Sequence, residues 1–212
     1  MLAKSHKMYP SKQINDEVIL DPPAHLDLFL VNIHKYQEAG YTALIETIKG
    51  RLAEIKKTDA ALGYEMLEMA IQGLNIIFPY TLPITNTSAL YGLNGLKNTM
   101  IFNKKKNNFK YRNSILQEHG RIFSYSEIGK YSSKIASIMH SIKRSEGIIL
   151  IYSHLIYAGC VPIALALEEM GLQRYGRKSL FKTAPHPPVD YKTMRPASGD
   201  APFIPATYAM IT

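Results

Sequence analysis

The stretch from Lys130 to Gly171 constrains the fold more than any other part of the chain. It opens with the pattern of an amphipathic helix. Ser132 and Ser133 can cap that helix, because their side-chain oxygens accept hydrogen bonds from free backbone amides. The apolar residues that follow recur at the spacing of one helix face: Ile135, Ile138, Met139 and Ile142. Gly147 then ends the pattern.

An apolar run and a second helix follow at once. Residues Ile148–Tyr152 contain aliphatic and aromatic side chains only, as expected for a parallel strand covered on both faces. Pro162 suits the first turn of the next helix and Gly171 suits its left-handed end. This order predicts an α/β protein with an open parallel sheet flanked by helices. Because ligands of such sheets bind beyond the carboxyl ends of the strands, we expect a functional edge at Tyr152, Ser153 and His154.

Residues 21–78 are predicted to be helical. Asp21 followed by Pro22-Pro23 is a helix-start signal, a second helix begins near Leu44 and ends at Lys56-Lys57, and Asp59 can cap a third. The apolar stripes of these helices are interpreted as core: Leu26, Phe29, Leu30 and Ile33; Leu44, Ile45, Ile48, Leu52 and Ile55; Leu62, Met66, Met69, Ala70 and Leu74. Pro79 and Pro83 close the region.

A basic block follows the helical region. No acidic residue lies between Glu68 and Glu118, and within that window the chain carries Lys97, Lys104, Lys105, Lys106, Lys110 and Arg112. With a net charge of +8, this block favours a polyanionic partner, nucleic acid before membrane. A solvated loop is the alternative. The interleaved rings of Phe102, Phe109 and Tyr111 either stack on bases or anchor the loop to the core.

The sequence suggests that the sheet is incomplete. Arg121–Tyr125 is a candidate short strand, and Tyr208–Ile211 resembles the start of another. Between them, residues 172–206 hold six of the 12 prolines and are predicted to be an extended, poorly ordered excursion. Counted with the apolar run, the chain supplies two or three strands, whereas a nucleotide-binding α/β domain has five or more.

Local motifs do not assemble a complete active site. The segment from Gly171 to Ser179 approximates a phosphate-binding P-loop, but Arg177 is an extra residue and a helix precedes it where a strand is required, so a helix stop followed by a basic loop is the better interpretation. Adjacent Glu168 and Glu169 point about 100° apart on a helix, which excludes a working carboxylate pair and favours a solvated face. The seven histidines show no paired spacing for metal.

The single Cys and the absence of an apolar span fit a chain in a reducing compartment that is neither secreted nor inserted in a membrane.

Several short sequences point to one family. They are Ile77-Phe78-Pro79, Tyr91-Gly92-x-x-Gly95-Leu96, Lys130–Ile135, Gly147–Ser153 and Pro162–Glu169. From about residue 70 onward the chain resembles the second half of the superfamily 2 helicase-like ATPases of large nucleocytoplasmic DNA viruses. These are relatives of the poxvirus early-transcription ATPases and, more distantly, of the Swi/Snf translocases.

The resemblance implies a fold and a role. Residues 1–118 would form a helical inter-domain region with a basic loop, and residues 119–212 would begin the second RecA-like domain. The strand end at Tyr152, Ser153 and His154 would correspond to helicase motif IV, which faces nucleic acid. ATP and Mg²⁺ would bind in the complete enzyme but not to this segment alone, which is expected to be inactive. The location implied is the host cytoplasm, at a viral factory, or the virion.

Two further hypotheses stay open beside the motor. The chain could be a non-catalytic nucleic-acid-binding or virion scaffold protein that uses an α/β fragment. It could also be an assembly protein whose half-built sheet is completed by another chain. The expected partners are therefore DNA or RNA, through Lys104, Lys105, Lys106, Lys110 and Arg112 and the motif IV residues, together with the missing motor portions or a second chain.

Overall fold

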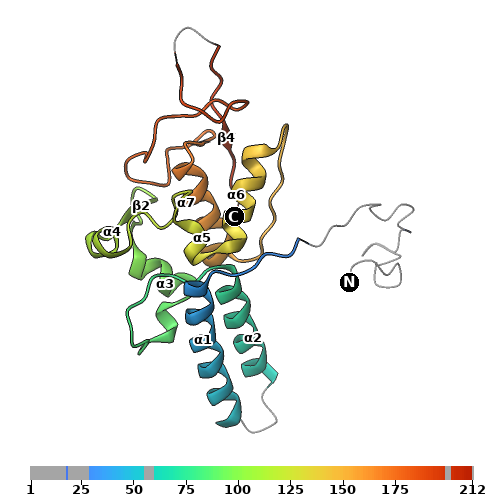
Figure 1. The fold of residues 1–212 in the computed structure, drawn as a ribbon, viewed down its shortest axis with the longest axis vertical. Helices are drawn as coiled ribbons and strands as arrows, with labels where there is room; N and C mark the ends of the chain where they lie inside the picture. The colour runs from blue at the N-terminus through green and yellow to red at the C-terminus, as the bar shows by residue number, and fades with distance from the viewer. Residues whose placement is uncertain (1–17, 19–28, 55–59, 199–201, 212) are drawn as a thin grey trace. The chain divides into compact units, whose positions relative to one another are not determined.

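The computed structural model describes residues 18, 29–54, 60–198 and 202–211, and the chain divides into two compact units, residues 1–32 and 33–212. In the first unit, Phe29 and Leu30 are exposed and non-helical. The helix predicted after Pro23 is therefore wrong for these two residues and also for Ile33, which is exposed and non-helical, and Leu26 lies outside the described residues. Everything below concerns the second unit, whose helices are labelled in Figure 1.

Two helices that lie side by side begin the second unit (Figure 1). They are α1 (Lys35–Glu54) and α2 (Ala60–Asn75), and their shared core contains Leu44, Ile48, Met66 and Met69. A Cβ on Gly73 would lie 2.7 Å from Leu44 Cδ2, so this glycine permits the close approach of the helices. The second and third predicted helices are thus confirmed, although α1 begins earlier than expected. Leu52 and Leu74, both predicted to be core, are exposed, and Ile55 and the Asp59 cap lie outside the described residues.

Short elements connect this helix pair to the rest of the unit. In chain order they are the 3₁₀ turn η3 (Thr87–Ala89), α3 (Gly92–Thr99), β1 (Met100–Asn103), β2 (Asn108–Tyr111), α4 (Asn113–His119) and α5 (Ile128–Tyr131). Strands β1 and β2 form an antiparallel hairpin in which Phe102 pairs with Phe109. The strand predicted at Arg121–Tyr125 is wrong, because these residues turn back on themselves and Ser124 N donates to Arg121 O at 2.8 Å.

Both helices of the central stretch are confirmed. They are α6 (Ser133–Arg144) and α7 (Val161–Glu169), joined through the π-helical turn η4 (Ile156–Cys160). Ser132 is the N-cap of α6, and its Oγ accepts a hydrogen bond from Ile135 N at 3.0 Å. Pro162 lies in the first turn of α7, and Gly171 adopts φ +90° beyond its end. The sequence signals for starts and stops therefore act here as expected.

The strand predicted at Ile148–Tyr152 is wrong in this structure. The segment forms no strand, and its exposed fractions alternate: Ile148 103%, Ile149 44%, Leu150 93%, Ile151 36% and Tyr152 86%. Figure 1 shows it within the extended connection between α6 and α7. The physical reason is the lack of neighbours, because among the described residues no strand hydrogen-bonds to it.

The observed sheets are small. Besides the hairpin, β3 (Gln173–Arg174) pairs in parallel with β4 (Thr207–Tyr208). The protein is thus mixed α and β. The strand predicted at Tyr208–Ile211 is wrong except at Tyr208, because β4 ends there and residues 209–211 are not in a strand.

The described part of the proline-rich segment 172–206 folds back rather than extending away. Leu172, Val189 and Ala206 pack with Leu167 of α7 in a small core. Hydrogen bonds fix the segment: Val189 N donates to Gly171 O at 3.2 Å, and Ala206 N donates to Val189 O at 2.8 Å. Its apolar residues find partners on α7, which overrides the composition signal.

The largest core gathers α3, the hairpin, α5, α6 and α7 around one set of buried side chains that runs from Ile76 to Phe181. This cluster draws residues from both sides of the predicted boundary between residues 118 and 119, which stays a prediction. Within the described parts of the chain, no helix is both long and apolar enough to cross a bilayer.

Candidate functional site

The basic hairpin, defined as residues 97–112, presents its cations to solvent. Lys104, Lys105 and Lys106 lie in the turn between β1 and β2, and Lys110 and Arg112 follow, all exposed. Asn107 takes φ +49° in this turn, a conformation that asparagine tolerates better than most residues. The structure therefore brings the five predicted cations onto one short antiparallel element.

The aromatic residues of the hairpin were predicted either to stack on bases or to anchor the loop to the core, and the structure contains residues suited to each role. Phe109 and Tyr111 are buried in the main core, so they anchor the hairpin. Phe102 is 41% exposed and stacks on Phe109, with ring centroids 4.7 Å apart. Ile101, on the other face of β1, is also half exposed. One ring therefore stays accessible for stacking beside the lysines.

Lys97, at the start of the hairpin, and Lys182, from far along the chain, join the five predicted cations. Arg112 Nε donates to the carbonyl oxygen of Lys97 at 2.8 Å, which ties the start of the block to its end. From far along the chain, Lys182 N donates to Phe109 O at 2.8 Å, and Phe109 N donates to Leu180 O at 2.6 Å. Sequence analysis missed Lys182, because nothing in its local pattern indicates that segment 180–182 pairs with β2.

The predicted edge at Tyr152, Ser153 and His154 is only partly available. Tyr152 is 86% exposed and His154 is exposed. Ser153 is half-buried, and its Oγ lies 3.2 Å from both the amide nitrogen and the carbonyl oxygen of Leu155, within its own turn. Among the described residues no hydrogen bond joins these three side chains to the hairpin. Their predicted role in nucleic-acid binding stays a prediction.

Glu168 is buried, which makes its assignment to a solvated face wrong. Its carboxylate accepts hydrogen bonds from Leu180 N at 2.6 Å, Phe181 N at 2.9 Å and Tyr208 Oη at 2.8 Å, and also from Ser179 Oγ. One side chain thereby holds the end of α7, segment 179–181 and β4 together. Burial, and then the Glu168 carboxylate, raise the pKa of Tyr208, so this phenol stays a donor.

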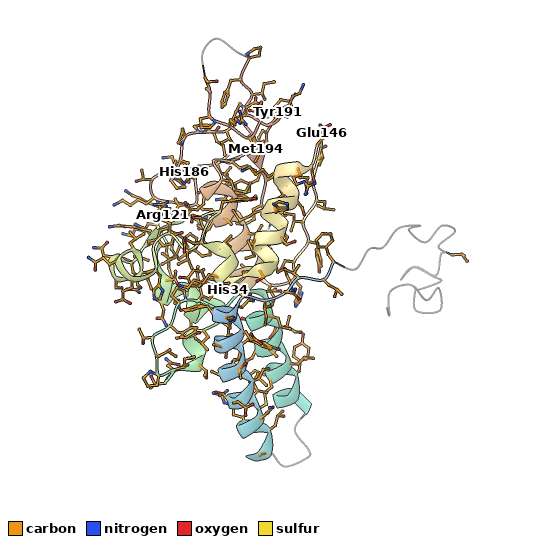
Figure 2. All side chains as sticks on the ribbon, in the orientation of Figure 1. His34, Arg121, Glu146, His186, Tyr191 and Met194 are labelled. Carbon is orange, nitrogen blue, oxygen red and sulfur yellow. The ribbon has the colours of Figure 1, made fainter. Side chains whose placement is uncertain are left out.

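Glu169 is also buried and has a separate set of partners. Arg121 forms a bidentate ion pair with it, in which Nε lies 3.0 Å from Oε2 and Nη2 lies 3.0 Å from Oε1. Tyr111 Oη donates to Oε1 at 2.9 Å, and His186 Nε2 lies 3.4 Å from Oε2. Figure 2 labels Arg121 and His186, which lie near one another beside α7. Burial, and then the Glu169 charge, raise the pKa of Tyr111.

The spacing of the two glutamates on the helix predicts that they do not form a carboxylate pair. In the structure each carboxylate has its own separate set of hydrogen-bond and ion-pair partners. Their burial has a signal in the sequence: the preceding residues Val161–Leu167 are apolar on every side, and such a helix lies inside a core. A charged residue on it must then find partners. Those partners, Arg121 and Tyr208 above all, are too distant in sequence to be recognised.

The remaining candidate residues and motifs form no recognisable site among the described residues. Gly171 ends α7, and residues 175–179 form turns rather than a helix, so the P-loop interpretation has no support. Across the residues whose placement is described, no three His, Cys, Asp or Glu side chains group to hold a metal ion. Cys160 is half-buried, with Sγ 3.5 Å from Ser153 O.

Comparison with known proteins returned no match at any level: no family model, no curated protein and no solved structure is similar to this chain.

Proposed function

We propose that this chain is part of an ATP-dependent nucleic-acid helicase or translocase, to which it contributes the opening of the second RecA-like motor domain and contacts to the nucleic-acid backbone. The observation that carries the proposal is the apolar segment Ile148–Tyr152, which follows α6 in the chain and leaves its alternate side chains open to solvent. Its sequence is the one that resembles helicase motif IV.

The alternating exposure is that of a strand without neighbours. Ile148, Leu150 and Tyr152 are open, while Ile149 and Ile151 are half covered. An extended apolar segment without a strand partner among the described residues promotes association with another strand, because its backbone groups and its exposed side chains can still pair. In a RecA-like sheet both faces of the segment would be covered. The strands that would pair with this segment would come from other portions of the motor or from another chain.

The basic hairpin supports the nucleic-acid part of the proposal. Lysines that protrude from a turn neutralise phosphates without reading sequence, and the exposed Phe102 ring offers a surface for a base. In the complete enzyme ATP and Mg²⁺ would bind between two RecA-like domains, and hydrolysis would alternate their grip on the strand. This segment alone would bind neither.

Salt-dependent binding tests the nucleic-acid contact. The purified chain should bind single-stranded DNA or RNA with log K falling linearly against log salt. Lys104→Glu and Lys105→Glu should weaken binding, and replacing one contacting lysine by Ala should reduce the slope by about 0.7 for a single strand. Lys49→Glu, on an exposed position of α1, is the matched control. Absence of binding at low salt would refute this part of the proposal.

ATP hydrolysis tests the motor. The isolated chain should show no Mg²⁺-dependent ATPase activity above background. Joined to the remaining motor portions, it should support activity that nucleic acid stimulates, and the double substitution Ile148→Ser/Leu150→Ser should abolish this stimulation. Hydrolysis by the isolated chain would contradict the assignment to a partial motor.

A second candidate function is a non-catalytic nucleic-acid-binding or virion scaffold protein. The basic hairpin favours this function, because its residues Phe109 and Tyr111 are buried in this chain's own core and hold it in place without another chain. On this hypothesis the chain would bind nucleic acid fully by itself, and Ile148→Ser/Leu150→Ser would leave function in place. The location proposed under either hypothesis is the host cytoplasm, at a viral factory, or the virion.

A further inference from the structure

A cavity of about 230 Å³ opens beside the C-terminal end of α7. Its polar lining comes from Glu168, Gln173, Arg174, Arg177, Ser179 and His186. These residues belong to the end of α7, to β3 and the turn after it, and to the proline-rich segment. Neither proposed function uses Arg174 or Arg177.

Segment 171–198, which supplies all of the cavity lining except Glu168, is rich in cations. Residues 171–198 carry six cations, Arg174, Arg177, Lys178, Lys182, Lys192 and Arg195, against the single acidic residue Asp190. The Asp190 carboxylate is already engaged, since it accepts from the amides of Lys192, Thr193 and Ile204. These backbone hydrogen bonds lower the pKa of Asp190 and hold it charged within its own turn.

The arginines that line the cavity keep their donors available. In the part of the chain that the structure describes, neither Arg174 nor Arg177 forms an ion pair. The one carboxylate in the lining, Glu168, is saturated by four donors and is therefore no ligand for a cation. Two arginines without an ion pair among the described residues, both lining one small cavity, thus leave a site for an anion.

We propose that this cavity binds a phosphate group. Guanidinium presents its N–H donors in a planar fork that matches phosphate oxygens, and two such groups compensate for the nearby Glu168 charge. The Gln173 amide adds neutral donors at the same opening. The volume is below the roughly 300–1,000 Å³ of pockets that enclose a drug-sized ligand, so the site takes a small oxyanion rather than a whole nucleotide.

This inference does not depend on the proposed function. The phosphate can belong to a nucleic-acid backbone or to a free phosphate ester, since both present the same oxygens. The site is separate from the basic hairpin in its side chains, so variants of one leave the other intact.

A titration with inorganic phosphate tests the site. Amide and arginine Nε–H NMR signals of the full chain are followed at constant ionic strength, with chloride as the reference anion. The signals of residues 173–179, Ala184 and His186 should shift and saturate, and Arg177→Ala and Arg174→Ala should each raise Kd about tenfold. Arg174→Lys should recover only part of the affinity, because lysine keeps the charge without the fork.

Lys178→Ala is the matched control, since Lys178 adjoins Arg177 in sequence, is exposed and does not line the cavity. It should leave Kd within about twofold, as expected when only a screened surface charge is removed. Because Arg177 is exposed, Arg177→Ala is expected to fold, and unchanged dispersion of its spectrum checks this. Shifts that never saturate, or that Lys178→Ala weakens as much as Arg177→Ala, would overturn the proposal.

Competition experiments distinguish the two possible sources of the phosphate, a nucleic-acid backbone and a free phosphate ester. A single-stranded oligonucleotide without terminal phosphates that displaces inorganic phosphate supports a backbone contact, whereas displacement by adenosine monophosphate alone supports a free ester. The hairpin substitution Lys104→Glu should leave phosphate binding unchanged. A loss of phosphate binding with Lys104→Glu would overturn the assignment to this cavity, and failure of oligonucleotide binding with phosphate binding intact would refute only the proposed function.

Discussion

The end of α7 and the segment before η4 reverse the usual distribution of polar and apolar residues. Glu168 and Glu169 are buried, while Ile148, Leu150 and Tyr152 are almost fully exposed. The difference lies in partners: the described residues supply four donors to Glu168 and three partners to Glu169, but no strand to the apolar segment. Burial in this protein therefore follows the availability of partners more closely than residue type.

The largest expected effect comes from removing a buried carboxylate. Glu168→Ala should lower the free energy of unfolding by about 3–5 kcal/mol, because four donors lose their acceptor together. Urea denaturation measures it. Glu46→Ala, which breaks only an exposed pair with Lys49, should cost about 0.5 kcal/mol or less. Equal effects of the two substitutions would remove the contrast between the regions.

Arg121→Ala should have the next largest effect, about 2–4 kcal/mol, because it leaves the Glu169 charge buried without its cation. Arg121→Lys keeps the charge but loses the two-pronged geometry, so its stability should fall between that of Arg121→Ala and the wild type. Thermal and urea unfolding of the three proteins give the order. A wild-type value for Arg121→Ala would show that water or His186 compensates for the ion pair.

A smaller, pH-dependent effect is expected at His119. Burial, and then the charge of Lys130, lower the pKa of this imidazole, while Glu118 opposes the change. The folded state therefore binds fewer protons than the unfolded state, so His119 contributes stability above the unfolded pKa of about 6.5 that is lost as pH falls. The free energy of unfolding measured from pH 7.5 to 5 should fall less steeply in His119→Gln.

The smallest effect on stability is expected in the exposed apolar segment. Ile148→Ser/Leu150→Ser should change the free energy of unfolding by no more than about 0.5 kcal/mol, since both side chains already contact water. Leu165→Ser, in the core of α7, is the contrasting variant and should cost several times more. A large loss from the double substitution would mean that the segment is packed in solution, and sedimentation velocity would show whether a second copy covers it.

Local signals in the sequence predicted local structure well. The Ser132 cap, the Pro162 start and the Gly171 stop all act within a few residues, so the boundaries of α6 and α7 could be found without a structure. The apolar character of Ile148–Tyr152 was also recognised, but a strand is defined by its neighbours, and composition does not reveal whether they are present.

The candidate site was predictable only in part. The five hairpin cations are adjacent in sequence and could be recognised as a block. In contrast, Glu169 meets Arg121 across 48 positions and Glu168 meets Tyr208 across 40, and such pairings depend on tertiary structure. The all-apolar surroundings of the two glutamates were the one local indication that they needed buried partners.

The connection between the basic hairpin and α7 has a mechanical consequence. Phe109 in β2 exchanges hydrogen bonds with Leu180 and Lys182, and the amides of Leu180 and Phe181 in turn donate to Glu168. If a bound polymer pulled on the hairpin, the force would be transmitted to α7 through these few hydrogen bonds, without passing through a long loop.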